Sequence, residues 1–416
     1  MDVEEIFSAV RRREFDRSFI GQADLDVLVR ERRSALPWRG QFTPGLVSKL
    51  LDAYYPGSGM VVDPFLGSGT TVLECIRKGI PSAGVEINPA ALELSGILEI
   101  ASLPHDQRLR IVQEASSYLD KVADAGQDTL FGSSTGIEDV IEDVVEYLLD
   151  GHRGAVDKNI ERIFSTTLLL SMGDKKEADA KKVKKSWNQV RDLITDFPSA
   201  SVPSQVIAGD ARRVPLGDGC AGLVVTSPPY INVFNYHQNY RPAVENIGWN
   251  VLPAARTEIG SNRKNRQNRF LTVIQYCVDM MQALCEMERL VFEAGNVVLV
   301  VGRESRVRGV AFSNSEIVAA LAEGLPNLRF ARWQERKFTN RFGAVIYEDV
   351  LSFEVDKKTS IVPSGAKLDE FSREVARHVL TEALEQSADD VRKDLQSAVE
   401  SVTKVEASPE LSLLKV

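Results

Sequence analysis

Residues 226–230, Thr-Ser-Pro-Pro-Tyr, follow an apolar run and combine oxygen acceptors with an aromatic ring. Pro228 and Pro229 offer carbonyls without N–H groups, and Ser227 adds a hydroxyl that can accept or donate. Such a lining presents acceptors to an amino group, while Tyr230 supplies a flat face on which a base can stack. A rigid turn or a polyproline ligand is the alternative interpretation, but such a ligand normally lies in a disordered tail, not after a Val-rich strand.

A glycine-containing motif, DPFLGSGTT from Asp63, follows another apolar run and precedes a helical pattern. Gly67 and Gly69 allow the backbone to approach a ligand where a Cβ would clash. The motif is not the dinucleotide fingerprint, because its third glycine would fall at Val72, and it is not a P-loop, because no Gly-Lys-Ser/Thr follows. Taken alone, the loop is equally compatible with an ordinary tight turn.

Two carboxylates end further predicted strands. Glu86 lies about 23 residues after Asp63, an offset at which an acidic residue accepts hydrogen bonds from ribose hydroxyls. Asp210, in the stretch GDAR, is placed to accept a hydrogen bond from an amino group such as that of adenine. The alternatives are a surface glutamate and a common Gly-Asp turn.

The elements that must position these residues alternate between short Val- and Ile-rich strands and helices. This alternation predicts an α/β fold of Rossmann-like type, with a doubly wound, mainly parallel sheet and an antiparallel hairpin over residues 332–355. Folds of this type bind ligands at the carboxyl ends of their strands, which is where all four polar signatures fall.

Composition and charge narrow the class of protein. The 416 residues are 44% hydrophobic and 26% charged, as in an ordinary globular protein. No apolar run is long enough to cross a bilayer, and the acidic start MDVEEIF is not a signal peptide, so we expect a prokaryotic cytosolic or nucleoid location. Because the chain has only four scattered histidines, we expect no His-rich metal site. The four cysteines lack a C-x-x-C pair and predict reduced thiols: Cys75, Cys220, Cys277 and Cys285.

The motifs DPFLGSGTT, VEINP and TSPPY together resemble the S-adenosylmethionine-dependent DNA methyltransferases that modify exocyclic amino groups. The resemblance covers about residues 37–95 and 205–355. Ser227 in the tetrapeptide is the form typical of cytosine-N4 enzymes, whereas Asp and Asn forms are typical of adenine-N6 enzymes. The glycine motif precedes the Pro-Pro motif here, the reverse of many relatives, but a permuted order leaves the sheet intact.

The resemblance implies S-adenosylmethionine as cofactor and no metal. It implies that Ser227, Pro228, Pro229 and Tyr230 form the catalytic motif, with Ser227 and the Pro228 carbonyl holding the target amino group and Tyr230 stacking on a flipped base. The implied cofactor-binding residues are Thr43, Asp63, Phe65, Gly67, Gly69, Glu86 and Asp210.

The implied substrate is double-stranded DNA, and the resemblance suggests a cognate restriction endonuclease as a further partner. The net charge of −9 argues mildly against non-specific binding, but one loop is basic. Its cations and neighbouring amides can contact phosphates and base edges, although a solvated polar loop is the alternative. The candidate DNA-binding residues are Arg263, Lys264, Arg266 and Arg269.

The chain is predicted to divide into five segments. These are an N-terminal helical segment (1–36), the cofactor-binding half (37–100), a helical insertion (101–204), the catalytic half (205–356) with a DNA-contact loop (231–270), and a polar helical tail (357–416). The insertion either recognises target DNA or braces the sheet.

The predicted function is a site-specific cytosine-N4 DNA methyltransferase of a restriction-modification or anti-phage system. An adenine-N6 enzyme is the nearest alternative, followed by an RNA amino-methyltransferase and a non-catalytic DNA-binding subunit. Cytosine-C5 chemistry is not expected, because it needs a Pro-Cys nucleophile and the chain has no such dipeptide.

Overall fold

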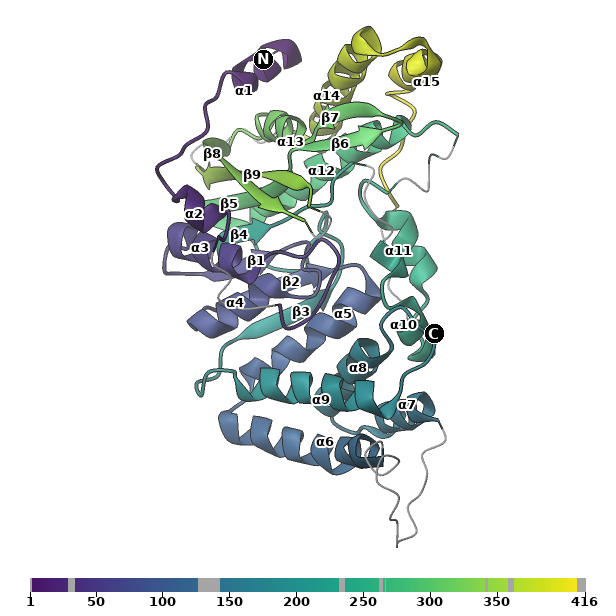
Figure 1. The fold of residues 1–416 in the computed structure, drawn as a ribbon. Coiled ribbons are helices and arrows are strands. Elements are labelled where there is room, and N and C mark those ends of the chain that lie inside the picture. The colour runs from purple at the N-terminus through teal and green to yellow at the C-terminus, as the bar shows by residue number, and fades with distance from the viewer. Residues whose placement is uncertain are drawn as a thin grey trace, which may run out of the picture.

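The structure is a computed structural model that describes residues 2–28, 34–125, 143–231, 236–261, 265, 267–340, 343–357 and 363–409 (Figure 1). Within these residues, seven strands form one sheet in the order β3-β2-β1-β4-β5-β9-β8. The first five strands are parallel, and β9 runs antiparallel to both β5 and β8. The strands are β1 (Met60–Asp63), β2 (Ser82–Glu86), β3 (Ser204–Ala208), β4 (Ala221–Thr226), β5 (Val291–Gly302), β8 (Leu328–Thr339) and β9 (Val345–Val355).

This architecture confirms the predicted α/β fold, including the antiparallel hairpin. From β1 the chain first adds strands on one side, β2 and β3, and then on the other, β4 and β5. The change of side between β1 and β4 is the topological switch point at which doubly wound sheets bind ligands. The glycine motif follows β1 and the Pro-Pro motif follows β4. The switch point therefore lies between the two motifs that the sequence singled out.

Both faces of the sheet are buried, which explains why its strands are continuous apolar runs. Successive residues of a strand point to opposite faces, so Val61 and Val225 join one core while Val62 and Val224 join the other. Helix α3 (Pro44–Tyr54) covers the first face. The second face is covered by α12 (Leu271–Leu290), α13 (Asn314–Ala322) and α14 (Gly365–Gln386).

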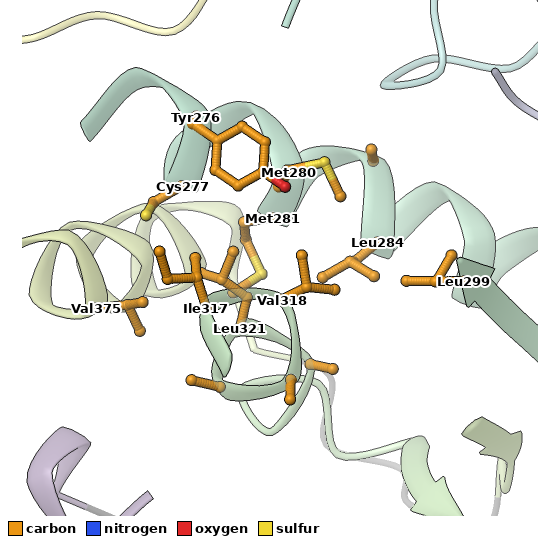
Figure 2. Close-up of a cluster of buried hydrophobic side chains, with 14 of the residues drawn as sticks. Tyr276, Cys277, Met280, Met281, Leu284, Leu299, Ile317, Val318, Leu321 and Val375 are labelled. Atoms are coloured by element: carbon orange, nitrogen blue, oxygen red, sulfur yellow. The ribbon is translucent and has the colours of Figure 1, made fainter. Parts of the chain in front are cut away.

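Figure 2 shows part of the second core, where helices from distant parts of the chain meet. Met281 and Leu284 of α12 face Ile317 and Val318 of α13, and Val375 of α14 belongs to the same cluster. Helix α14 is therefore integrated into the core of the catalytic half. The shorter elements that complete the described chain are α1 (Val3–Arg11), α2 (Gln22–Leu25), α10 (Arg241–Asn246), α11 (Val251–Thr257), α15 (Asp389–Glu400), β6 (Glu304–Val307), β7 (Val310–Ser313) and the 3-10 helices Ile97–Ser102 and Tyr236–Gln238.

The helical insertion packs against the helices that follow the glycine loop. Its helices α6 (His105–Ala125), α7 (Val144–Gly154), α8 (Lys158–Met172) and α9 (Ala180–Thr195) gather beyond β3 in Figure 1. They share one hydrophobic core with α4 (Thr70–Lys78) and α5 (Pro89–Gly96). This shared core supports the interpretation that the insertion braces the sheet.

Among the residues that the structure describes, no helix combines the length and the apolar character that a membrane span requires.

Replacement of Trp187 tests the packing of the insertion. Its side chain is fully buried in α9, and its indole N–H donates to Asp120 at 2.9 Å. Because truncation leaves a large cavity, Trp187→Ala should lower the free energy of unfolding by about 3–5 kcal/mol, measured by urea denaturation. Leu109→Ala, at a position that is 48% exposed on α6, is the control and should change it little. Equal stability of the two variants would contradict the described core.

Candidate active site

Asp63 links the two loops at the switch point. It ends β1, is buried, and accepts hydrogen bonds from the hydroxyls of Thr226, at the end of β4, and of Thr71, in α4, at 2.5 and 2.6 Å. The Phe65 N–H also donates to it at 3.1 Å. Burial raises the pKa of Asp63 to about 6, although all three hydrogen bonds lower it. The glycine loop and the Pro-Pro motif are thereby held at one edge of the sheet.

The glycine loop has backbone geometry that other residues rarely adopt. Gly67 and Gly69 have φ values of +55° and +91°, in the left-handed region. A Cβ on Gly69 would lie 2.4 Å from Cδ1 of Leu98, so this position has no room for a side chain. The loop leads directly into the N-terminus of α4, where unpaired N–H groups and the helix dipole favour anionic or electron-rich groups.

Glu86 is fixed beside this loop. Its carboxylate accepts hydrogen bonds from the N–H groups of Gly67, Ile87 and Asn88, at 2.6, 2.9 and 2.7 Å. Burial raises the pKa of Glu86 to about 7, against the opposite effect of these three bonds. A carboxylate oriented in this way retains lone pairs that can accept from hydroxyl groups.

Asp210 lies at the end of the neighbouring strand. The Gly209 N–H donates to the Glu86 carbonyl at 3.0 Å, which brings the ends of β2 and β3 together. Arg212 then holds the Asp210 carboxylate with its Nε at 3.0 Å, its Nη2 at 2.6 Å and its backbone N–H at 2.9 Å. The sequence reasoning missed this arginine, whose only local signal is its position two residues after Asp210.

The predicted contacts of Thr43 and Phe65 stay predictions. Thr43 is half-buried at the start of α3, and the segment before it reaches the glycine loop, since Ser68 Oγ donates to the Leu36 carbonyl at 2.8 Å. Phe65 is half-buried and packs against the main core.

Aromatic residues that are not among the predicted cofactor-binding residues lie beside the glycine loop. A Cβ built on Gly67 would lie 3.4 Å from Cδ1 of Trp38, whose ring stacks near Tyr240 with centroids 6.2 Å apart. Burial raises the pKa of Tyr236 to about 12, and the negative charges of Glu258 and Glu86 add to this effect. Tyr236 and Tyr240 both belong to the predicted DNA-contact loop, so part of this loop lies near Glu86 and Trp38.

The hydroxyl oxygen of Ser227 is oriented so that it can accept a hydrogen bond. It donates its hydrogen to the Val300 carbonyl at 2.8 Å, which leaves the lone pairs of its oxygen available. Pro228 is buried and Pro229 half-buried, and the Tyr230 hydroxyl lies 3.5 Å from Ser227 Oγ. The tetrapeptide thus presents oxygen atoms at the end of β4, next to the Asp63 link.

The ring of Tyr230 is held by residues far along the chain. A Cβ on Gly302 would lie 2.6 Å from its Cε2, so the ring packs directly on β5. Its hydroxyl donates to Glu348 at 3.4 Å, and Glu348 also pairs with Arg336 at 2.9 Å. Burial, together with the charge of Glu348, raises the pKa of Tyr230 well above its usual value. Sequence reasoning could not find Gly302 or Glu348, because neither lies in a motif.

The predicted DNA-contact loop is only partly described. Arg263, Lys264 and Arg266 lie outside the described residues, whereas Arg269 is described and exposed. At the base of the loop, Asn268 donates to the Asp394 carbonyl of α15 at 2.7 Å.

Comparison with known proteins gives matches to short stretches of the chain. Residues 25–96 match the N6/N4 methylase family model, which is described as DNA methylase. Over 53 residues the chain is 42% identical to the type II methyltransferase M.MjaII of Methanocaldococcus jannaschii, covering 13% of this chain and 10% of that protein. Over 63 residues it is 38% identical to the type II methyltransferase M.ScaI of Streptomyces caespitosus, covering 15% and 20%. The chain thus spans a fifth or less of the length of these curated relatives.

Solved structures are matched more broadly and at low identity. TrmN from Thermus thermophilus gives a TM-score of 0.32 at 14% identity, covering 76% of this chain and 50% of that chain. The rRNA methyltransferase aviRa from Streptomyces viridochromogenes gives 0.33 at 12% identity, covering 82% and 94%.

The raised pKa of Glu86 predicts a pH-dependent affinity for S-adenosylhomocysteine. Ribose hydroxyls donate best to the ionised carboxylate, and with a pKa of about 7 this form predominates only above neutral pH. Affinity should therefore increase about tenfold from pH 6 to pH 8, measured by calorimetric titration. The Glu86→Gln variant should bind more weakly and with little pH dependence. An affinity of the wild type that falls over this range would contradict the assignment.

Proposed function

We propose that the protein transfers a methyl group from S-adenosylmethionine to the exocyclic N4 amino group of a cytosine flipped out of duplex DNA. The observation that carries this proposal is the Asp63–Thr226 hydrogen bond, which holds the glycine loop and the Ser-Pro-Pro-Tyr motif at one sheet edge. A donor on the first loop and an amino group on the second would then be neighbours.

The residues of the first loop fit the cofactor. Gly67 and Gly69 give the loop a left-handed backbone that other residues rarely adopt, Glu86 is oriented toward the loop for the ribose, and Asp210 stands at the next strand end for the adenine amino group. When bound, S-adenosylmethionine supplies a methyl group on a positively charged sulfur.

The second loop activates the amino group through its acceptors. The nitrogen of a cytosine amino group is a poor nucleophile because its lone pair is delocalised into the ring. Ser227 Oγ and the Pro228 carbonyl accept hydrogen bonds from its two hydrogens, which favours tetrahedral geometry and localises the lone pair. They would also stabilise the positive charge that grows on this nitrogen as it displaces the sulfur from the methyl carbon, after which the nitrogen would lose a proton to water. Most of the rate enhancement then comes from positioning and electrostatics.

DNA is the proposed substrate because residues 25–96 match a DNA methylase family and because the predicted contact loop is basic. Flipping the base costs a few kcal/mol, and Tyr230 would stack on it. Since both curated relatives are named type II methyltransferases, we infer a role in a restriction-modification or anti-phage system in the prokaryotic cytosol, with a cognate endonuclease as partner. The choice of cytosine over adenine depends on Ser227, where Asp or Asn would favour adenine-N6.

Methyl transfer in a host that lacks DNA methylation tests the proposal. DNA from cells that express the protein should yield N4-methylcytosine when digested nucleosides are analysed by mass spectrometry. Finding N6-methyladenine would change the target base, and methylation of RNA alone would change the substrate. Transfer to neither nucleic acid would favour a non-catalytic protein and contradict the proposal.

Removal of the Ser227 hydroxyl should slow the chemical step. Ser227→Ala removes one acceptor for the amino group, so kcat should fall about 100-fold. Affinity for S-adenosylhomocysteine should stay near normal, because the hydroxyl belongs to the second loop. Ser397→Ala, an exposed position on α15, is the matched control. Wild-type turnover by Ser227→Ala would remove Ser227 from the catalytic motif.

The ring and the hydroxyl of Tyr230 can be tested separately. Tyr230→Phe keeps the stacking face and loses only the long contacts with Ser227 and Glu348, at 3.5 and 3.4 Å. This variant should methylate DNA at close to the normal rate. Tyr230→Ala loses base stacking worth about 1–3 kcal/mol and should cripple turnover. Equal activity of the two variants would refute the stacking role.

A further inference from the structure

A buried network of hydrogen bonds, the polar knot, connects residues 401–409, which follow α15, to α12. Its members are Arg212, Gln275, Asp279 and Ser408. Asp279 of α12 is fully buried, and its carboxylate accepts from the backbone N–H of Ser408 at 2.8 Å and from the Ser408 hydroxyl at 2.7 Å. Gln275, one turn earlier in α12, donates to Ser408 Oγ at 2.9 Å. Ser408 itself is buried. The 401–409 segment thus enters the interior at this serine.

The same knot contains the arginine that holds Asp210. The side chain of Arg212 is 5% exposed, and its Nη1 donates to Asp279 at 2.9 Å and to the Ser408 carbonyl at 2.7 Å. Its Nε and Nη2 donate to Asp210 at 3.0 and 2.6 Å. One rigid guanidinium plane therefore connects the 401–409 segment to a carboxylate of the cofactor site.

The first part of this segment is held on the α14 side. Val402 is buried there, Val405 packs against the same core, and Arg373 of α14 donates to both carbonyls at 2.7 Å. A pocket of about 360 Å³ separates residues 401–406 from the start of α12. Attachment next to Arg212 therefore rests on the hydrogen bonds of Ser408 and on the Pro409 carbonyl, which accepts from Arg212 Nη2 at 3.1 Å.

We propose that Ser408 is a positioning residue of the cofactor site, which orients Asp210 toward the adenine amino group through Asp279 and Arg212. This inference rests on the proposed function, because it assumes that Asp210 receives the cofactor's adenine. It adds that a segment about 200 residues further along the chain sets the affinity for that ring.

The physical reason is competition for one guanidinium. Without the Ser408 hydroxyl, Oδ2 of the buried Asp279 carboxylate loses its donor, while Oδ1 keeps the Ser408 N–H and Arg212. The unsatisfied oxygen then draws more strongly on Arg212. The guanidinium then moves toward Asp279 and leaves Asp210 less constrained. Asp210 should accept the adenine amino group less well, whereas the catalytic motif at β4 keeps its own hydrogen bonds to Val300.

The test compares two ligands by calorimetric titration. S-Adenosylhomocysteine carries the adenine amino group, and its deaminated analogue, S-inosylhomocysteine, has oxygen in that place. The wild type should prefer the first ligand. In Ser408→Ala this preference should shrink about threefold to tenfold, while kcat at saturating donor and KM for DNA stay unchanged. Ser401→Ala, the same change in the same segment but outside the knot, should retain the full preference.

Asp279→Asn is a second variant of nearly equal volume that guards against a folding defect of Ser408→Ala. It removes the charge that competes with Asp210 for Arg212, so the preference should be retained or should increase. If Ser408→Ala discriminates like the wild type, or if Asp279→Asn loses the preference, the inference is wrong. If the wild type binds neither ligand, the proposed function itself fails. A loss of affinity that is equal for the two ligands would indicate a general structural role and overturn the positioning role.

Discussion

The hydrogen bond from Thr226 to Asp63 is the contact on which the arrangement of this molecule depends. It joins the ends of two neighbouring parallel strands, and each strand is followed by one of the two motifs that could do chemistry. Burial raises the pKa of Asp63 to about 6, so keeping the ionised carboxylate inside costs stability at neutral pH. The hydroxyls of Thr71 and Thr226 offset part of that cost. A residue that destabilises the fold in this way is expected where position matters for function.

A common principle governs the polar groups around this link. Hydrogen bonds within the chain fix the orientation of each of these groups. Ser227 gives its hydrogen to Val300, Glu86 is fixed by three backbone N–H groups, and Asp210 is held by Arg212. Acceptors fixed in advance need not reorganise when charge develops on a substrate, which is the main source of electrostatic catalysis. Residues 401–409 extend this network to a part of the chain that no motif marks.

The fold and the motifs could be predicted from the sequence because their signals are local. Val-rich runs of strand length indicated β1, β4 and β5, and polar residues after them indicated the carboxyl edge of a parallel sheet. Arg212, Glu348 and Ser408 could not be assigned, because their partners lie between 2 and 196 residues away and only tertiary packing brings them together. The core that the insertion shares with α4 and α5 likewise could not be predicted, because only the folded chain brings these apolar faces together.

A structure of the protein with S-adenosylhomocysteine and duplex DNA would test the central claim most directly. The account predicts that the ligand's sulfur lies above the glycine loop and faces a flipped base whose amino group contacts Ser227 Oγ and the Pro228 carbonyl. A ligand bound at another edge of the sheet, or a base held on a surface remote from that sulfur, would contradict it.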